Sequence, residues 1–339
     1  MSSVYTTLGG TGLSVSRLCL GTARFGRAVN TDRTRRLDEQ IIDRETAHDL
    51  LDTAFDQGVN FIDTANSYGR PVEGRAERYI GEWLDGRDRE SVVVASKVYG
   101  DMGDGPNDAG LSRKHVRAQL RGTLDRLGTD YVDIYYLHRW DDDTPITETL
   151  STLDDAVRAG RVHHIGLSTA AAWQLVKAQW TSDVNGWEPV SITQPKYNAV
   201  HRAPVAPYLD ACVDSNVGIC VYSPLAGGFL TGKYERSTPE PSASRASRDR
   251  GFLDRPERDW RVLDTIRTVA EELDATPTQV ALAWLLAHER HAAFTPIPVV
   301  GPRTVDQLRD NLSALSLSLP QDAYSRISDA YGHVSETAR

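Results

Sequence analysis

Eight short apolar runs, each separated from the next by an amphipathic segment, constrain the fold of this chain more than any other feature. The runs have the length of strands and span 17–21, 59–63, 92–97, 132–138, 162–167, 190–194, 218–223 and 297–300. Helical periodicity marks the segments 44–57, 73–84, 112–127, 146–159, 170–179, 205–215, 277–287 and 305–312. Apolar strands that alternate with helices are typical of a parallel sheet buried on both faces. Eight such units predict an α/β fold, the (β/α)8 or TIM barrel.

Three further segments lie outside this repeat. Residues 5–8 and 13–16 flank a turn with three glycines and predict an N-terminal β-hairpin. Residues 258–273 predict an extra helix in the C-terminal half. The stretch 235–256 is rich in Ser, Arg, Pro and Asp and lacks apolar periodicity, so we expect a long lid-like loop there. Barrels commonly reach this size as one unit, so we expect a single domain over residues 1–339.

The charge balance and the cysteines exclude several classes of protein. The net charge of −9 disfavours nonspecific attraction to nucleic acid or to an anionic membrane. No apolar stretch reaches the roughly 18 residues of a spanning helix, and residues 1–10 lack a signal-peptide pattern, so we expect a cytoplasmic protein. Three widely spaced cysteines predict reduced, buried thiols without a disulfide or zinc site. The sequence does not indicate the oligomeric state.

Asp63, Lys97 and His138 end three of the strand-like runs, and Tyr68 follows Asp63 by five residues. By the two-residue alternation of strands, each of the first three continues an apolar row on one face of its run. Neighbouring parallel strands lie roughly 4.8 Å apart, so their carboxyl ends would bring an acid, an amine and an imidazole together. For each residue alone, the alternative is an ordinary polar residue at the end of a structural element. The convergence of four indicates a site.

The four side chains suit the reduction of a carbonyl group. Tyrosine has a reference pKa of about 10, and a nearby ammonium such as that of Lys97 lowers this value by stabilising the phenolate. Asp63 would pair with Lys97 and hold it in place. His138 would donate a hydrogen bond to the carbonyl oxygen as charge develops there. Tyr68 would then give the proton while hydride arrives at the carbon.

Six segments resemble the aldo-keto reductases, and the similarity covers nearly the whole chain. They are NFIDTANSYG (60–69), ASK (95–97), LHRWD (137–141), IGLST (165–169), TQPKYN (193–198) and VYSPLAGGFLTGKY (221–234). The resemblance implies a single barrel that binds NADP(H) in extended form at the carboxyl ends of its strands. It also implies a catalytic set made of Asp63, Tyr68, Lys97 and His138.

The resemblance also implies a set of cofactor-binding positions. Ser168 and Gln194 would bind the carboxamide, and Tyr222 would stack on the nicotinamide. Arg303 would bind the 2′-phosphate, although a solvated residue at the start of a helix is the alternative. Thr169 stands where the family often has Asn, which puts its contact with the carboxamide in doubt. The remaining implied positions are Gly21, Thr22, Asp63, Ser223, Pro224, Leu225, Gly227, Leu230, Lys233, Gly301, Gln307 and Asn311.

The substrate and the activity are less constrained. Segments 73–84 and 100–112 resemble bacterial members that act on keto sugars. The side chains that we place around the substrate, with simple packing as the alternative, are Arg24, Phe25, Tyr99, Met102, Arg139 and Trp140. A cofactor-sensing binding subunit on the same barrel, like the ion-channel β subunits of this family, is the rival to an enzyme.

Four motifs of other classes are incomplete. Gly227, Gly232 and Lys233 match a phosphate-binding loop, but Tyr234 replaces the Ser or Thr that binds magnesium. Residues 166–170 begin like the nucleophile elbow of an esterase, but alanine replaces its second glycine. No GxGxxG follows a strand-like run, so a Rossmann domain has no motif support. Histidines 288 and 291 do not complete HExxH, and we expect no metal site.

Overall fold

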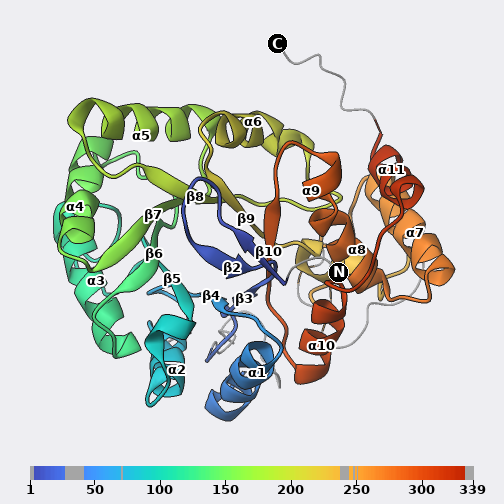
Figure 1. Cartoon of the computed structure of the whole chain (residues 1–339), viewed down its shortest axis with the longest axis horizontal. Coiled ribbons are helices and arrows are strands. Elements are labelled where there is room, and N and C mark those ends of the chain that lie inside the picture. The colour runs from blue at the N-terminus through green and yellow to red at the C-terminus, as the bar shows by residue number, and fades with distance from the viewer. Residues whose placement is uncertain are drawn as a thin grey trace.

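The computed structural model describes residues 4–26, 42–69, 72–236, 244–246, 249 and 251–332. Eight parallel strands form a closed barrel in the order β10-β3-β4-β5-β6-β7-β8-β9, and β10 pairs with both β3 and β9 to close it (Figure 1). The strands are β3 (Cys19–Gly21), β4 (Phe61–Asp63), β5 (Val93–Val98), β6 (Val132–Leu137), β7 (Val162–Ser168), β8 (Val190–Gln194), β9 (Gly218–Tyr222) and β10 (Pro296–Val300). The predicted TIM barrel is therefore confirmed.

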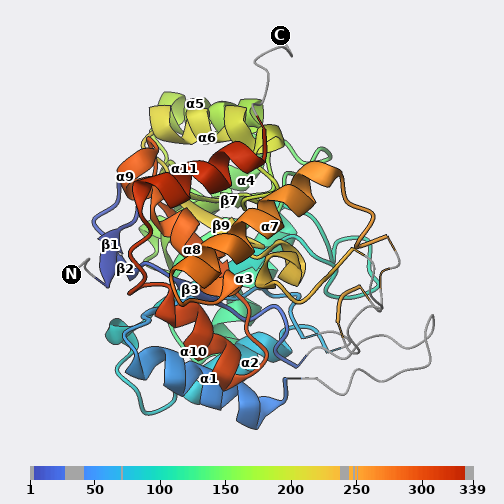
Figure 2. The same cartoon turned by 90° about the vertical axis from the view of Figure 1, so that its right-hand side faces the viewer.

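Eight helices follow the strands and form the outer ring. They are α1 (Arg44–Asp56), α2 (Arg75–Leu84), α3 (Arg113–Leu127), α4 (Ile146–Arg158), α5 (Ala172–Asn185), α6 (Ala206–Asp214), α8 (Pro277–Leu286) and α10 (Val305–Ser313). The expected extra helix is α7 (Glu257–Glu272), and Figure 2 shows it beside α11 (Gln321–Ala330), which the sequence did not predict. The short elements are α9 (His288–His291) and the 3-10 turns η1 (Arg89–Ser91), η2 (Ala203–Val205) and η3 (Ala226–Thr231).

Local sequence explains where several of these helices begin and end. At the start of α8, the Thr276 hydroxyl accepts a hydrogen bond from the Gln279 backbone N–H, and the Gln279 side chain accepts one from the Thr276 backbone N–H. This capping box, followed by Pro277 at the first helical position, fixes the helix start. Helix α3 ends at Gly128, whose φ of 64° is the left-handed conformation that favours glycine.

Alternation along the strands separates two apolar clusters. One lies inside the barrel and includes Phe61, Ala95, Ile134 and Tyr136, as the alternation predicts. Val132 departs from its predicted row, because it packs in the larger cluster that includes the surrounding helices. Cys19 and Cys220 belong to the inner cluster, and the three cysteines are buried and free.

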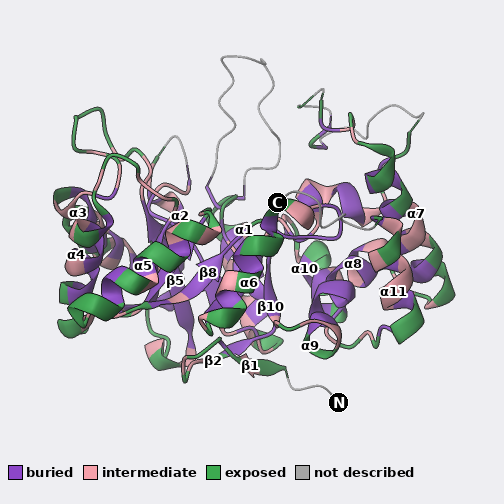
Figure 3. Cartoon of the chain, turned by 90° about the horizontal axis from the view of Figure 1, so that it is seen from above, coloured by how far each residue is buried: buried purple, intermediate pink, exposed green. Residues whose placement is uncertain are grey.

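The predicted hairpin forms from β1 (Tyr5–Thr7) and β2 (Ser14–Ser16), which pair antiparallel. Its Leu8 packs in the inner cluster, and the backbone N–H of Gly10 donates to the carbonyl of Asn216 at 2.9 Å. Figure 3 shows the hairpin, β1 and β2, at one end of the barrel. The hairpin therefore covers one end of the barrel and leaves the site to the other.

Three further expectations concern the lid-like loop, membrane-spanning helices and the domain organisation. Part of the lid-like loop, namely 237–243, 247–248 and 250, lies outside the described residues. In the described part of the chain, no helix combines the length and apolar character that crossing a bilayer requires. The single domain over 1–339 stays a prediction.

Candidate active site

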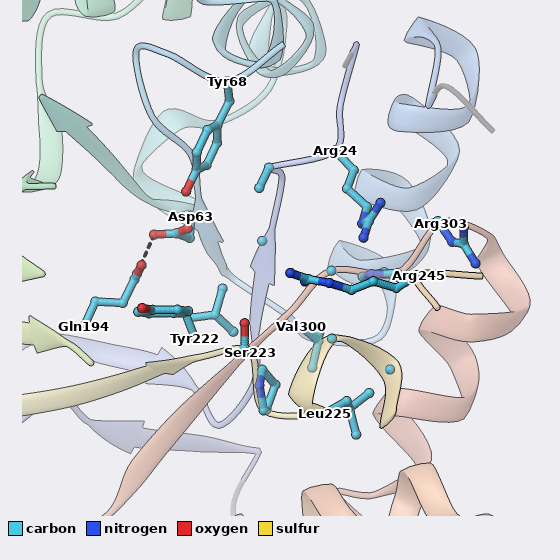
Figure 4. A pocket seen from close by; sticks show the side chains of 18 of the residues that line it. Arg24, Asp63, Tyr68, Gln194, Tyr222, Ser223, Leu225, Arg245, Val300 and Arg303 are labelled. Atoms are coloured by element: carbon cyan, nitrogen blue, oxygen red, sulfur yellow. Dashed lines mark hydrogen bonds between the residues drawn. The ribbon is translucent and has the colours of Figure 1, made fainter. Parts of the chain in front are cut away.

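A cavity of about 1620 Å³ lies where the carboxyl ends of the strands meet (Figure 4). Five strands contribute the side chain of their last residue: Asp63 from β4, Ser168 from β7, Gln194 from β8, Tyr222 from β9 and Val300 from β10. The loops that follow the strands supply most of the remaining wall. In a barrel of this type, these loops are where function is built, because they can vary without disturbing the packed strands.

A buried ion pair lies beneath the cavity. The Nζ atom of Lys97 is 2.6 Å from Oδ2 of Asp63, and the two side chains are 0% and 5% exposed. Lys97 also donates to the backbone carbonyl of Thr64 at 2.8 Å, while Nε2 of Gln194 donates to Oδ1 of Asp63 at 2.7 Å. Both carboxylate oxygens are thus bonded. This network compensates the cost of burying two charges.

Tyr68 presents its phenol above this pair. Its Oη accepts a hydrogen bond from Nζ of Lys97 at 3.3 Å, and Nζ lies 4.9 Å from the centre of the Tyr68 ring. Burial raises the pKa of Tyr68 above its ordinary value, and this effect outweighs the lowering by Lys97. The expectation of a lowered pKa is therefore wrong in its net direction, since sequence does not reveal the burial. The phenol stays protonated near neutral pH.

The imidazole of His138 lies against the same phenol. The two rings meet edge to face with centres 5.8 Å apart, and the His138 backbone N–H donates to the Val98 carbonyl at 3.0 Å. Burial, together with the positive charges of Lys97 and Arg139, lowers the pKa of His138 to about 3. His138 is therefore neutral at physiological pH, and its ring carries one N–H donor and one acceptor.

Lys97 needs its neighbours to remain charged. Burial alone lowers the pKa of its ammonium, but Asp63 and Tyr68 together raise it above the ordinary value. The structure thus brings the four predicted residues into one cluster with a fixed positive charge at its centre. Such a cluster can donate a proton from Tyr68 and stabilise the phenolate that remains.

The neighbouring wall carries the groups predicted for the nicotinamide end of a dinucleotide. The Ser168 hydroxyl donates to the Gln194 carbonyl at 2.8 Å and lies 3.3 Å from the Thr169 hydroxyl. Neither partner is a base, so Ser168 lacks the activation that an esterase nucleophile needs. Tyr222 lies beside Gln194 in the cavity wall (Figure 4). Asn198 fixes the turn that follows Tyr222, because its Nδ2 donates to the Ser223 carbonyl at 2.9 Å.

A tight turn follows Tyr222. Ser223 and Ala226 have φ values of 55° and 52°, and Gly227 and Gly228 have φ values of 69° and 96°. This left-handed backbone favours glycine and lets the main chain line the cavity at close range. Tyr234 does not act as a magnesium ligand, because its side chain is buried and packs on Phe252, with the two ring centres 5.4 Å apart. The described residues also hold no cluster of three metal-binding side chains.

Positive charge gathers at the end of the cavity away from Tyr68. Figure 4 shows Arg24, Arg245 and Arg303 on the side opposite Tyr68 and Gln194, and Lys233 also lines the wall. Arg303 precedes α10, and the side chains of Gln307 and Asn311 follow it into the cavity at intervals of four residues. Guanidinium groups bind phosphate oxygens well. A long cavity with an aromatic ring at one end and arginines at the other fits a dinucleotide.

Most of the predicted side chains line this cavity. Of the cofactor set, those that do are Gly21, Asp63, Ser168, Gln194, Tyr222, Ser223, Pro224, Leu225, Gly227, Lys233, Gly301, Arg303, Gln307 and Asn311. Of the substrate set, those that do are Arg24, Tyr99 and Arg139.

Five residues of the cofactor and substrate sets lie outside the lining, as does Lys97 of the catalytic set. Phe25 and Leu230 are buried in the core, where they pack against other apolar side chains. Thr22 is buried, and its hydroxyl donates to the Asp63 carbonyl at 3.0 Å. Trp140 packs edge to face on Trp173 with ring centres 5.7 Å apart. The backbone N–H of Met102 donates to the Asp108 carbonyl within its own loop.

Several lining residues were not predicted, and they come mainly from loops. The charged ones are Glu73, Asp101, Arg245, Asp249 and Asp310. Arg245 and Asp249 belong to the lid-like loop, so the loop does reach the cavity. Loops lack periodicity, and their composition therefore marked the segment without singling out these two side chains.

The fold and the site together define an oxidoreductase that is built on a TIM barrel and not on a Rossmann domain. Residues 17–331 match the model of the aldo/keto reductase family. The chain belongs to this family.

Three proteins that are similar to this chain carry names for different roles. The chain is 39% identical to an uncharacterised oxidoreductase, YrpG, of Bacillus subtilis, over 96% of this chain and 95% of the relative. It is 34% identical to an L-glyceraldehyde 3-phosphate reductase of Escherichia coli O157:H7, over 80% and 79%. It is 31% identical to a probable voltage-gated potassium channel subunit beta of Arabidopsis thaliana, over 92% and 91%.

Proposed function

We propose that this chain reduces an aldehyde or a ketone to an alcohol, with NADP(H) as the reductant and Tyr68 as the proton donor. One observation carries the proposal. The Tyr68 hydroxyl faces the cavity 3.3 Å from an ammonium that Asp63 holds at 2.6 Å, beside the neutral ring of His138. A phenol next to a buried positive charge is suited to release a proton.

The residues of the cavity wall would hold the cofactor. Ser168 and Gln194 offer a hydroxyl and an amide for the carboxamide, and Tyr222 offers an aromatic face. Arg303 and Lys233 offer positive charge for the phosphates. When bound, the nicotinamide supplies the hydride that the carbonyl carbon accepts.

Side chains of this chain would donate the proton to the carbonyl oxygen and stabilise the charge that results. Tyr68 stays protonated because its pKa is raised by burial, so the donor is present in its acid form at neutral pH. As the proton moves to the carbonyl oxygen, Lys97 stabilises the phenolate that develops. Asp63 balances Lys97, and the Gln194 amide holds Asp63 in place. His138 donates a hydrogen bond to the same oxygen without adding a charge.

The substrate end of the cavity favours a polar carbonyl compound. Tyr99 and Arg139 line it, with the Arg139 guanidinium 5.2 Å from the centre of the Tyr99 ring. The E. coli relative is named for an aldehyde that carries a phosphate. A keto sugar or a polar aldehyde is therefore the class that we propose.

A panel of carbonyl compounds assayed with NADPH and with NADH tests the proposal. We expect steady NADPH oxidation with at least one polar aldehyde or keto sugar. The plant relative named as a channel subunit supports the rival function, a cofactor-sensing binding subunit. Tight NADPH binding without turnover across the whole panel would favour that rival and contradict our proposal.

A further inference from the structure

Helix α5 exposes a row of apolar side chains. Trp173, Val176, Trp180 and Val184 are 58%, 52%, 64% and 56% exposed. They are three or four residues apart, so they lie along one side of the helix. They make up half of the large apolar side chains that stand out as exposed among the residues described. Exposed apolar side chains that cluster in this way mark interaction sites, whereas single ones are ordinary.

The opposite side of α5 already packs against the barrel. Its buried residues are Leu175, Ala178, Thr181 and Ser182, and the helix contacts β8, α4 and α6. The exposed row is therefore not a core face that was left partly open. Figure 1 shows α5 next to α6 in the outer ring, and α6 carries a further exposed valine, Val213 (40%).

The part of the row around Trp180 is symmetric about it, whereas Trp173 has no counterpart within α5. Val176 and Val184 stand four residues before and after it, and Lys177 and Asp183 stand three residues before and after it. Lys177 and Asp183 are both exposed, and neither forms an ion pair within the described chain. Positions three and four residues away on either side share the face of the central residue.

We propose that α5 pairs with α5 of a second copy of this chain, antiparallel and around a two-fold axis that passes beside Trp180. That axis exchanges the positions on either side of the tryptophan. It places Val176 opposite Val184, brings two Trp180 rings together, and sets Lys177 opposite Asp183 on both sides. A two-fold interface uses the same patch on both subunits, so a self-complementary patch is what it requires.

The composition of the row suits an interface centre. Tryptophan is enriched among the residues that dominate binding energy, and these residues concentrate near the middle of an interface. The two Lys177–Asp183 pairs would fix the antiparallel direction, because a parallel arrangement places like charges together. A different kind of partner would have no need of this internal symmetry.

Sedimentation velocity over a wide range of protein concentration tests the proposal. We expect the wild-type chain to form a dimer and Trp180→Glu to weaken dimerisation by roughly 30-fold or more. Val4→Glu is the matched control, since Val4 is an exposed valine (41%) beside the hairpin, and this variant should still form a dimer. Far-UV circular dichroism should be the same for the three proteins.

A charge exchange tests the register. Lys177→Asp should weaken the dimer, because it places two negative charges opposite each other, and adding Asp183→Lys should restore it. Recovery in the double variant would support the antiparallel pairing. A monomeric wild-type chain, a dimer that survives Trp180→Glu, or a double variant as weak as Lys177→Asp would each overturn the proposal. None of these residues lines the cavity, so the outcome is independent of the proposed reduction.

Discussion

Removing the ammonium of Lys97 should destabilise the fold as well as the reaction. In Lys97→Met, the buried Asp63 carboxylate loses its ammonium partner, and the Gln194 amide is the side-chain partner that remains among the described residues. Breaking a buried ion pair from one side costs about 3–5 kcal/mol of unfolding free energy. Unfolding entropy of about 2.1 cal/mol/K per residue, applied to 339 residues, converts this loss to about 4–7 °C in Tm.

The double variant separates charge from shape. Asp63→Asn in the Lys97→Met background removes the stranded charge, so it should recover part of the lost free energy. The double variant is therefore expected to be more stable than Lys97→Met alone. Urea unfolding followed by far-UV circular dichroism gives the free energies of the wild type, both single variants and the double variant.

An exposed ion pair provides the control. Arg326 bonds both oxygens of Glu272, but the two side chains are 40% and 46% exposed. Arg326→Met should therefore destabilise the fold far less than Lys97→Met. A Lys97→Met protein as stable as the wild type, or a double variant no more stable than Lys97→Met, would refute the reasoning from burial.

Three other predictions concern the cofactor, pH and the barrel interior. Arg303→Ala should weaken NADPH binding roughly 10- to 100-fold and NADH binding little, because a charge-assisted hydrogen bond is lost. Calorimetry with both cofactors checks this, with Arg309→Ala as the control. An unchanged ratio of NADPH to NADH affinity would reject the prediction. The pH profile of kcat/KM should show no inflection between about pH 5 and 9, since the pKa of His138 is lowered to about 3 and that of Tyr68 is raised. An inflection near pH 6.5 that His138→Gln abolishes would disprove this. Gly166→Ala should cost about 1–3 kcal/mol, because a Cβ there would collide with the Tyr136 ring; an unchanged urea midpoint would contradict it.

The barrel was predictable because its signal is repeated eight times along the chain. Alternation placed Asp63 and Lys97 on the inner face of neighbouring strands, and the 2.6 Å contact between them follows from that placement. The end of α5 was missed for the opposite reason. Trp180 and Val184 face outward, so they interrupt the amphipathic period that marks a helix, and the expected helix stopped at residue 179.

Two kinds of information remained beyond sequence reasoning. The net pKa shift of Tyr68 depends on how deeply the phenol is buried, and burial is a property of the assembled fold. The contributions of Arg245 and Asp249 depend on the path of a long loop without periodicity. Phe25 and Leu230 were predicted to line the site because of their positions in motifs. Their side chains are buried in the core instead, and the motifs did not reveal this.

The turnover of Tyr68→Phe compared with that of Tyr99→Phe tests the proposed mechanism most directly. Both substitutions remove one hydroxyl from the same cavity, but Tyr68 alone of the two bonds to Lys97 in the described structure. With NADPH and a carbonyl compound that the wild type reduces, Tyr68→Phe should lower kcat roughly 100- to 10,000-fold and leave NADPH affinity unchanged. Tyr99→Phe should keep most of the wild-type kcat. Turnover by Tyr68→Phe at the wild-type rate would contradict proton donation by Tyr68.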